Sequence, residues 1–167
     1  MPEYQITIDC ADPDRMARFW AVALGYELQG PPEGHDTWRE YWLSVGVPED
    51  EVEDGYDSVV DPDGTRPRIW FQQVPEAKSV KNRLHFDLLA GGGRKVPIGE
   101  RRERVIAEAT RLVGEGATEL HRKDQPEYDH YFIGLADPEG NEFDVVSISY
   151  QLPAIGLEKR SVSRFQD

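Results

Sequence analysis

His85 and Asp87 are the two residues whose types and spacing point most directly to chemistry. They lie in the run Arg83–Leu89, where polar and apolar side chains alternate as in a strand. Residues two apart in a strand point to one face, about 7 Å apart. A histidine oriented by a carboxylate is a common general base, so His85 and Asp87 are candidate catalytic residues, although the same pair often has a structural role. A hydrogen-bonded cavity histidine and a metal ligand are the alternatives for His85.

Tryptophan residues form a second candidate group. Trp38 and Trp42 lie in the run Trp38–Val47, which we predict to be a strand with both rings on one face. Trp70 lies in another predicted strand, Arg68–Val74. Aromatic walls with few polar groups are typical of small-molecule pockets, so these three residues are candidate ligand contacts. Core packing or a dimer contact is the alternative.

The predicted strand Tyr4–Cys10 supplies a third group. Its alternate residues Ile6, Ile8 and Cys10 form an apolar face that should pack on a helix. The opposite face is polar and could line a cavity; it carries Gln5, Thr7 and Asp9. Thr7 and Asp9 are therefore also candidate ligand-binding residues.

The elements that must position these residues occur twice in the chain. The turn Asp61-Pro62-Asp63-Gly64 returns as Asp137-Pro138-Glu139-Gly140, and a strand-like run follows each copy. Each half opens with a strand and continues with an amphipathic helix that ends at glycine. The predicted helices begin at Pro13 and Glu100 and end before Gly25 and Gly114. The order is strand, helix and three strands in each half, and such a duplication predicts a site between the halves.

Other segments are predicted to be less regular. Pro48–Gly64 contains eight acidic residues and should therefore be a solvated excursion. A calcium loop is the alternative, but the segment lacks the ligand spacing of an EF-hand. Gly91-Gly92-Gly93 predicts a flexible loop without the spacing of a phosphate loop. We divide the chain into a first module, 1–75, a second module, 76–148, and a C-terminal tail, 149–167, that is polar.

Composition excludes several classes of function. A chain of 167 residues suits one domain or two small modules that share a core. The net charge of −13 argues against nucleic acid and anionic membranes as partners. There is no apolar run of about 18 residues, so we expect no membrane-spanning segment. Cys10 is the single cysteine, which we expect to be buried and inert, and its isolation fits a reducing cytoplasm.

Three stretches together resemble the vicinal oxygen chelate superfamily, which includes glyoxalase I, bleomycin-resistance proteins and extradiol dioxygenases. They are Ile6–Trp20, Asn82–Leu88 and the most specific of them, Ala136–Phe143. The resemblance covers about Tyr4–Ser147 and is strongest to the glyoxalase-like branch common in actinobacteria. It implies an α+β fold of two βαβββ modules whose curved mixed sheets enclose a shared cavity, with the helices outside.

The resemblance also implies where a metal would bind. Metal-binding members take one ligand from the opening strand and one from the closing strand of each module. Three of these positions match Gln5, His85 and Asp144. The fourth is displaced by extra residues at 65–67, and it falls on Arg68, Trp70 or Gln72, none of which is a carboxylate.

The best available metal set is therefore Gln5, Gln72, His85 and Asp144, with a single carboxylate. A hard divalent cation prefers more anionic ligands. We therefore expect no cofactor and keep a divalent metal, Ni, Zn, Fe or Mn, as the alternative. Asp144 could instead pair with His85 or Arg68 across the cavity.

These observations predict a glyoxalase-like protein that binds a small organic ligand and sequesters an aromatic metabolite or drug, as resistance-type members do. The alternative is a metal-dependent lyase or isomerase of the glyoxalase type, in which the metal polarises a carbonyl. An extradiol dioxygenase would need a second histidine where Gln5 stands. The resemblance further implies a homodimer, and we expect a cytoplasmic location.

Overall fold

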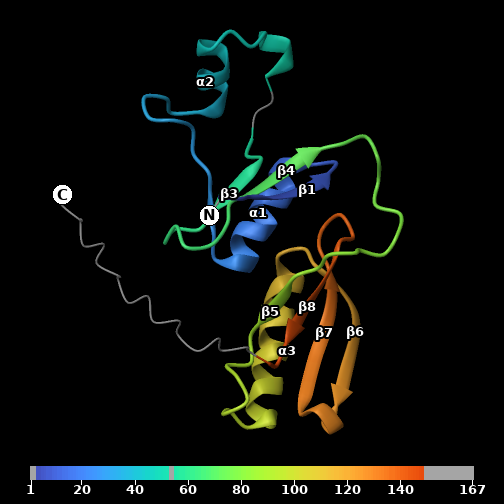
Figure 1. Cartoon of the computed structure of the whole chain (residues 1–167). Coiled ribbons are helices and arrows are strands. Elements are labelled where there is room, and N and C mark those ends of the chain that lie inside the picture. The colour runs from blue at the N-terminus through green and yellow to red at the C-terminus, as the bar shows by residue number, and fades with distance from the viewer. Residues whose placement is uncertain (1–2, 53–54, 149–167) are drawn as a thin grey trace, which may run out of the picture.

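The strands form two sheets of four in the computed structural model, which describes residues 3–52 and 55–148 (Figure 1). The first module consists of β1 (Ile6–Cys10), α1 (Pro13–Leu24), β2 (Glu27–Leu28), α2 (Trp38–Ser44), the 3-10 helix η1 (Glu49–Glu51), β3 (Ser58–Val60) and β4 (Ile69–Gln73). The second module consists of β5 (Asp87–Leu89), α3 (Ile98–Gly114), β6 (Thr118–Gln125), η2 (Pro126–Tyr128), β7 (His130–Ala136) and β8 (Glu142–Val146).

The two sheets share one topology. Their strand orders are β1-β4-β3-β2 and β5-β8-β7-β6. In each sheet the opening strand runs parallel to the closing strand, and the other pairings are antiparallel. Each half is thus a βαβββ unit with an open mixed sheet, which confirms the predicted repeat and the α+β class.

Helix α1 joins the two modules through its buried face. Asp12 caps the helix by accepting from the Arg15 N–H, Pro13 occupies its first turn, and Gly25 ends it with φ 65°. Trp20 on this helix is 2% exposed and lies edge-on against Phe86 and Phe143 of the second module. The hydrophobic core is therefore continuous across both halves.

Polar contacts reinforce the same junction. The Trp20 indole N–H donates to the Asp137 carboxylate at 3.2 Å. The Glu139 carboxylate accepts from the backbone N–H groups of Ala11 and Asp12 at 2.8 and 2.7 Å. The second Asp-Pro turn thus binds the beginning of α1 in the first module.

Cys10 is buried, as predicted. Its side chain lies in the core at 2% exposure, and burial raises the pKa of the thiol to about 12. Because the thiolate is the reactive form, this cysteine is inert at neutral pH.

The segment predicted to be the strand Trp38–Val47 is instead the helix α2, so that prediction is wrong. The Thr37 hydroxyl accepts from the Glu40 N–H at 3.1 Å, and the Glu40 carboxylate accepts from the Asp36 N–H at 2.9 Å. This reciprocal pattern is a helix start. A spacing of four places two residues on one face of either a strand or a helix, so Trp38 and Trp42 alone could not distinguish the two.

Two other predicted segments also differ. Pro48–Gly64 is not wholly solvated, because β3 lies within it and buries Ser58 and Val59. The predicted strand Arg83–Leu89 is shorter, since β5 begins at Asp87 and Leu84 is 74% exposed. The tail predicted for 149–167 lies outside the described residues. None of the helices in 3–52 and 55–148 is long and apolar enough to cross a membrane.

Two candidate functional sites

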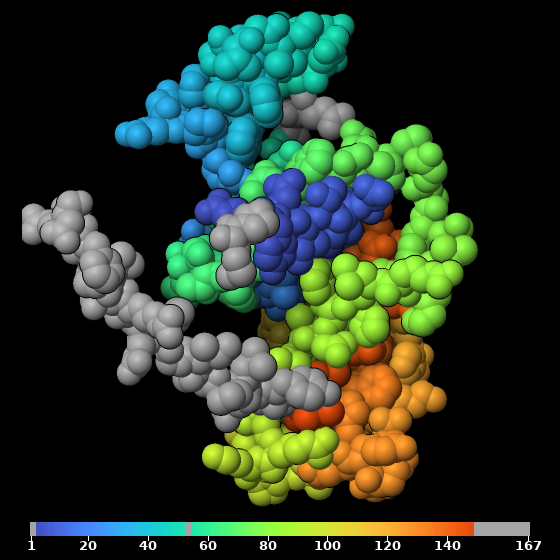
Figure 2. All heavy atoms as spheres, viewed as in Figure 1, coloured from blue at the N-terminus to red at the C-terminus, as the bar shows by residue number. Residues whose placement is uncertain are grey.

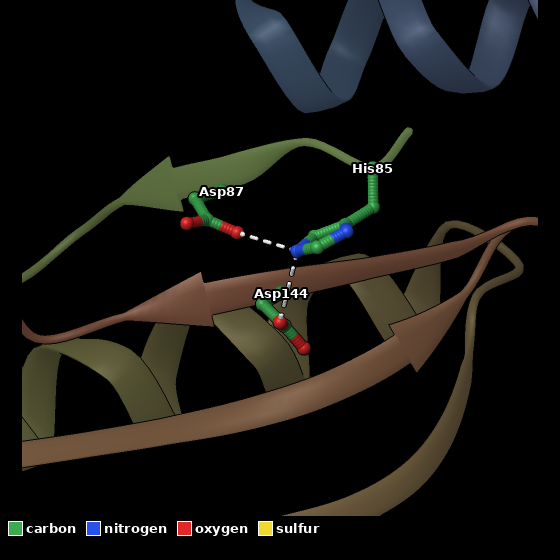
Figure 3. A group of neighbouring side chains, drawn as sticks. All are labelled: His85, Asp87 and Asp144. Carbon is green, nitrogen blue, oxygen red and sulfur yellow. Dashed lines mark ion pairs between the residues drawn. The ribbon is translucent and has the colours of Figure 1, made fainter. Parts of the chain in front are cut away.

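His85, Asp87 and Asp144 meet on the open face of the second sheet (Figure 3). Asp87 on β5 lies directly opposite Asp144 on β8, and His85 just precedes β5. The His85 Nε2 atom is 3.4 Å from Asp87 Oδ1 and 3.7 Å from Asp144 Oδ2. The predicted pair of His85 and Asp87 is thus joined by a carboxylate from the closing strand.

The spacing of these three residues suits a metal ion. Ligands of a tetrahedral zinc at about 2.1 Å from the ion lie about 3.4 Å from one another. The two distances from His85 Nε2, 3.4 and 3.7 Å, are close to that value and long for hydrogen bonds. One imidazole and two carboxylates are also a donor set that divalent metals accept. The residues present therefore fit a metal with three protein ligands.

The electrostatics of the cluster favour a positive charge there. Burial and the neighbouring charge of Asp87 raise the pKa of Asp144, whereas His85 and His121 act in the opposite direction. A cation near both carboxylates would relieve their mutual repulsion. The cluster can therefore hold either a metal or a protonated group of a ligand.

His121 is a residue of this site that sequence reasoning missed. It pairs with Gly134 on β7, which in turn pairs with Asp144. A side chain on Gly134 would collide with the His121 imidazole, so the glycine leaves room for that ring above the sheet. His85, His121 and Asp144 line a common cavity of about 190 Å³. The signal was a glycine inside the strand 130–136, which marks a close approach.

The register of the first sheet identifies the residue that corresponds to Asp144. Trp70 pairs with Ser58, which lies three residues before the first Asp-Pro turn. Asp144 pairs with Gly134, three residues before the second turn. Trp70, rather than Gln72, thus occupies the closing-strand position, and its indole N–H donates to Asp57 at 2.9 Å.

Gln5 and Arg68 are hydrogen-bonded to each other in the first module. The Gln5 side-chain oxygen accepts from Arg68 Nη1 at 2.7 Å, and Arg68 also donates to Gln29 and Ser58. Of the two partners expected for Asp144, His85 lies beside it, together with Asp87. Arg68 instead forms its hydrogen bonds with residues of the first module. Gln72 lies opposite Asp9 in the pairing of β1 with β4.

The three predicted tryptophans converge on one pocket of about 660 Å³, the tryptophan pocket. Its walls come from the β1–α1 turn, from α2 and the segment that follows it, and from β4. The Trp38 and Trp42 rings are stacked, with centroids 5.6 Å apart and planes at 22°, because they are one helical turn apart. Figure 2 shows the segment around α2 as a lobe that projects from the first module.

Hydrogen bonds hold the walls of the tryptophan pocket. The Trp38 indole N–H donates to the Gln29 carbonyl at 2.8 Å, which anchors α2 to the end of β2. Gly55, at φ 135°, passes so close to Asp14 that a Cβ would lie 3.0 Å away. This approach lets the Tyr56 N–H donate to Asp14 at 2.9 Å. Thr7 lines a different, smaller cavity with His85, and Asp9 is exposed on β1 and outside the tryptophan pocket.

The paired βαβββ modules define a protein of the vicinal oxygen chelate superfamily. Within it, the chain belongs to the glyoxalase-like domain family, whose model matches residues 5–146. No curated protein matches the chain.

Solved structures share the fold at low sequence identity. A glyoxalase/bleomycin resistance protein/dioxygenase family enzyme from Burkholderia phytofirmans is 18% identical, with a TM-score of 0.51 over 85% of this chain and 94% of that one. The fosfomycin resistance protein FosX from Listeria monocytogenes is 10% identical, with a TM-score of 0.55 over 89% and 91%. FosX from Mesorhizobium loti is 11% identical, with a TM-score of 0.52 over 89% and 92%. At these identities the likeness shows the fold alone.

Proposed function

We propose that this chain is a glyoxalase-like binding protein that holds a small planar organic molecule in the tryptophan pocket. The observation that carries the proposal is the convergence of Trp38, Trp42 and Trp70 on one cavity of about 660 Å³. That volume is ample for a drug-sized ligand, and indole faces favour stacking on planar rings.

Removing a pocket tryptophan is expected to weaken ligand binding. Titration with planar aromatic probes should quench the intrinsic fluorescence in a saturable way. Trp70→Ala should lower the affinity about tenfold, because each aromatic contact contributes about 0.5–1.5 kcal/mol beyond its buried area. Leu43→Ala, on the same helix as Trp38 but outside the pocket lining, is the matched control and should bind normally. Equal affinities for Trp70→Ala and the wild type would contradict the proposal.

A metal-dependent lyase or isomerase is the second candidate function, and the grouping of His85, Asp87 and Asp144 favours it. These three side chains would hold the metal and fix its place on the second sheet. A bound divalent metal supplies Lewis-acid polarisation of a carbonyl oxygen. His121, across the same cavity, lies where it could accept or donate a proton of the substrate.

Metal titration tests this second function without an activity assay. If the cluster is a metal site, calorimetry with Zn²⁺ or Ni²⁺ should show one equivalent bound, and Asp87→Asn should weaken it about tenfold or more by removing an anionic ligand. Asp9→Asn is the control, because Asp9 is an exposed carboxylate on the opening strand of the other module. Absence of binding, or equal loss in both variants, would exclude a specific site.

A further inference from the structure

The charged side chains that line the tryptophan pocket are all acidic. They are Asp12, Asp14, Glu51 and Asp57, and none of the lining residues is Lys or Arg. We propose that the pocket selects a planar organic cation, a proposal that rests on the aromatic-ligand function above. The aromatic walls would stack on the ring system, and the carboxylates would neutralise its charge.

Three of the four carboxylates have no cationic partner within the part of the chain that the structure describes. Asp14 is the exception, since it accepts from Arg18 at 2.7 Å. Asp57 accepts from Trp70 and from the Ser58 hydroxyl, and Ser58 in turn accepts from Arg68, so the carboxylate is oriented but has no direct ion pair among the described residues. No ion pair involves Asp12 or Glu51 among the described residues. These carboxylates would therefore repel an anionic ligand and attract a cationic one.

The contact between Asp57 and Trp70 is suited to a cation. The indole N–H donates to a carboxylate oxygen of Asp57 at 2.9 Å, so negative charge lies at the edge of the ring. That contact increases the electron density of the indole and strengthens its attraction for a cation over its face. Tryptophan is the best aromatic partner for cations, which are attracted to the face of its ring. The net charge of −13 adds long-range attraction.

The pocket carboxylates do not form a three-ligand cluster of the kind that would hold a metal ion, among the residues that the structure describes. In the described parts of the chain, the side chains grouped closely enough to hold a metal are His85, Asp87 and Asp144. Asp12, Glu51 and Asp57 are not grouped in this way. A planar cation that fills the pocket could contact more than one of these carboxylates, because all three line it.

Three acridines of similar size and different charge test the inference. Proflavine is a cation at neutral pH, acridone is neutral, and acridine-9-carboxylate is an anion. We expect proflavine to bind about tenfold or more tightly than acridone and the anion to bind most weakly, with a preference that shrinks as salt is added. If acridone and the anion bind as tightly as proflavine, cation selection is wrong, although the aromatic-ligand function stands. If none of the three binds, the proposed function fails as well.

Charge-neutralising variants test whether the pocket carboxylates cause the preference for the cation. Asp57→Asn keeps an acceptor for the Trp70 N–H, and Glu51→Gln keeps the shape of the side chain. Each should weaken proflavine about fivefold and leave acridone unchanged, because only the charge is lost. Asp63→Asn, an exposed acid of the first turn outside the pocket lining, is the matched control. An equal loss in Asp63→Asn would mean that proflavine senses only the net charge, which would overturn the inference.

Discussion

Trp20→Ala is expected to lower the free energy of unfolding by about 3–5 kcal/mol, the usual cost of truncating a large buried aromatic. Trp20 is 2% exposed, and its ring lies 5.1 Å from the centroids of both Phe86 and Phe143. Its indole N–H also satisfies the Asp137 carboxylate. Because all three partners belong to the second module, the variant should weaken the junction between the halves and not only the first module.

Two further variants separate packing from hydrogen bonding. Trp20→Phe keeps a ring but removes the donor to Asp137, so we expect a loss of about 1–3 kcal/mol. Val22→Ala changes an exposed residue of the same helix and should shift stability by less than about 0.5 kcal/mol. Urea denaturation followed by far-UV circular dichroism gives all three values. A Trp20→Ala protein as stable as Val22→Ala would show that the junction is not formed in solution.

The parts of the fold that sequence predicted depend on short-range chemistry. Both Asp-Pro turns are closed by their aspartates: Asp61 accepts from the N–H groups of Thr65 and Arg66, and Asp137 accepts from those of Glu139 and Asn141. Such contacts span a few residues and leave a clear pattern. The repeat and the two amphipathic helices could therefore be inferred from the sequence alone. The strand order of the first half was reached with one wrong strand, because Trp38–Val47 contains the helix α2 and β3 lies in the segment predicted to be solvated.

The parts that sequence could not settle depend on long-range pairing. Arg68, Trp70 and Gln72 lie on one face of a strand, so the sequence left all three as candidates for the position that corresponds to Asp144. The strand register, which depends on a longer turn, places Trp70 at that position. His121 enters the second site only because β6 pairs with β7 opposite Gly134. Local alternation cannot supply either result, since a register is fixed by contacts between distant segments.

Gly91→Ala is expected to cost about 3 kcal/mol, although the run of three glycines at 91–93 looks like a flexible loop. Gly91 is buried, and its N–H donates to the Val146 carbonyl at 3.3 Å. A Cβ there would meet the Ser147 carbonyl oxygen and lie 2.6 Å from its carbonyl carbon. These are backbone atoms next to the end of β8, so they cannot move aside as a flexible side chain would.

The run of glycines thus serves two physical needs. Gly92 and Gly93 have φ values of 83° and 91°, which side chains disfavour, whereas Gly91 needs space alone. Gly99→Ala is the matched control, because its Cβ would meet no atom within 4 Å at the start of α3. It should stabilise the protein by up to about 1 kcal/mol through helix propensity. Thermal unfolding compares the two variants. If both have a higher melting temperature than the wild type, the 91–93 segment is not packed against β8, because a close approach there must destabilise Gly91→Ala and leave Gly99→Ala unaffected.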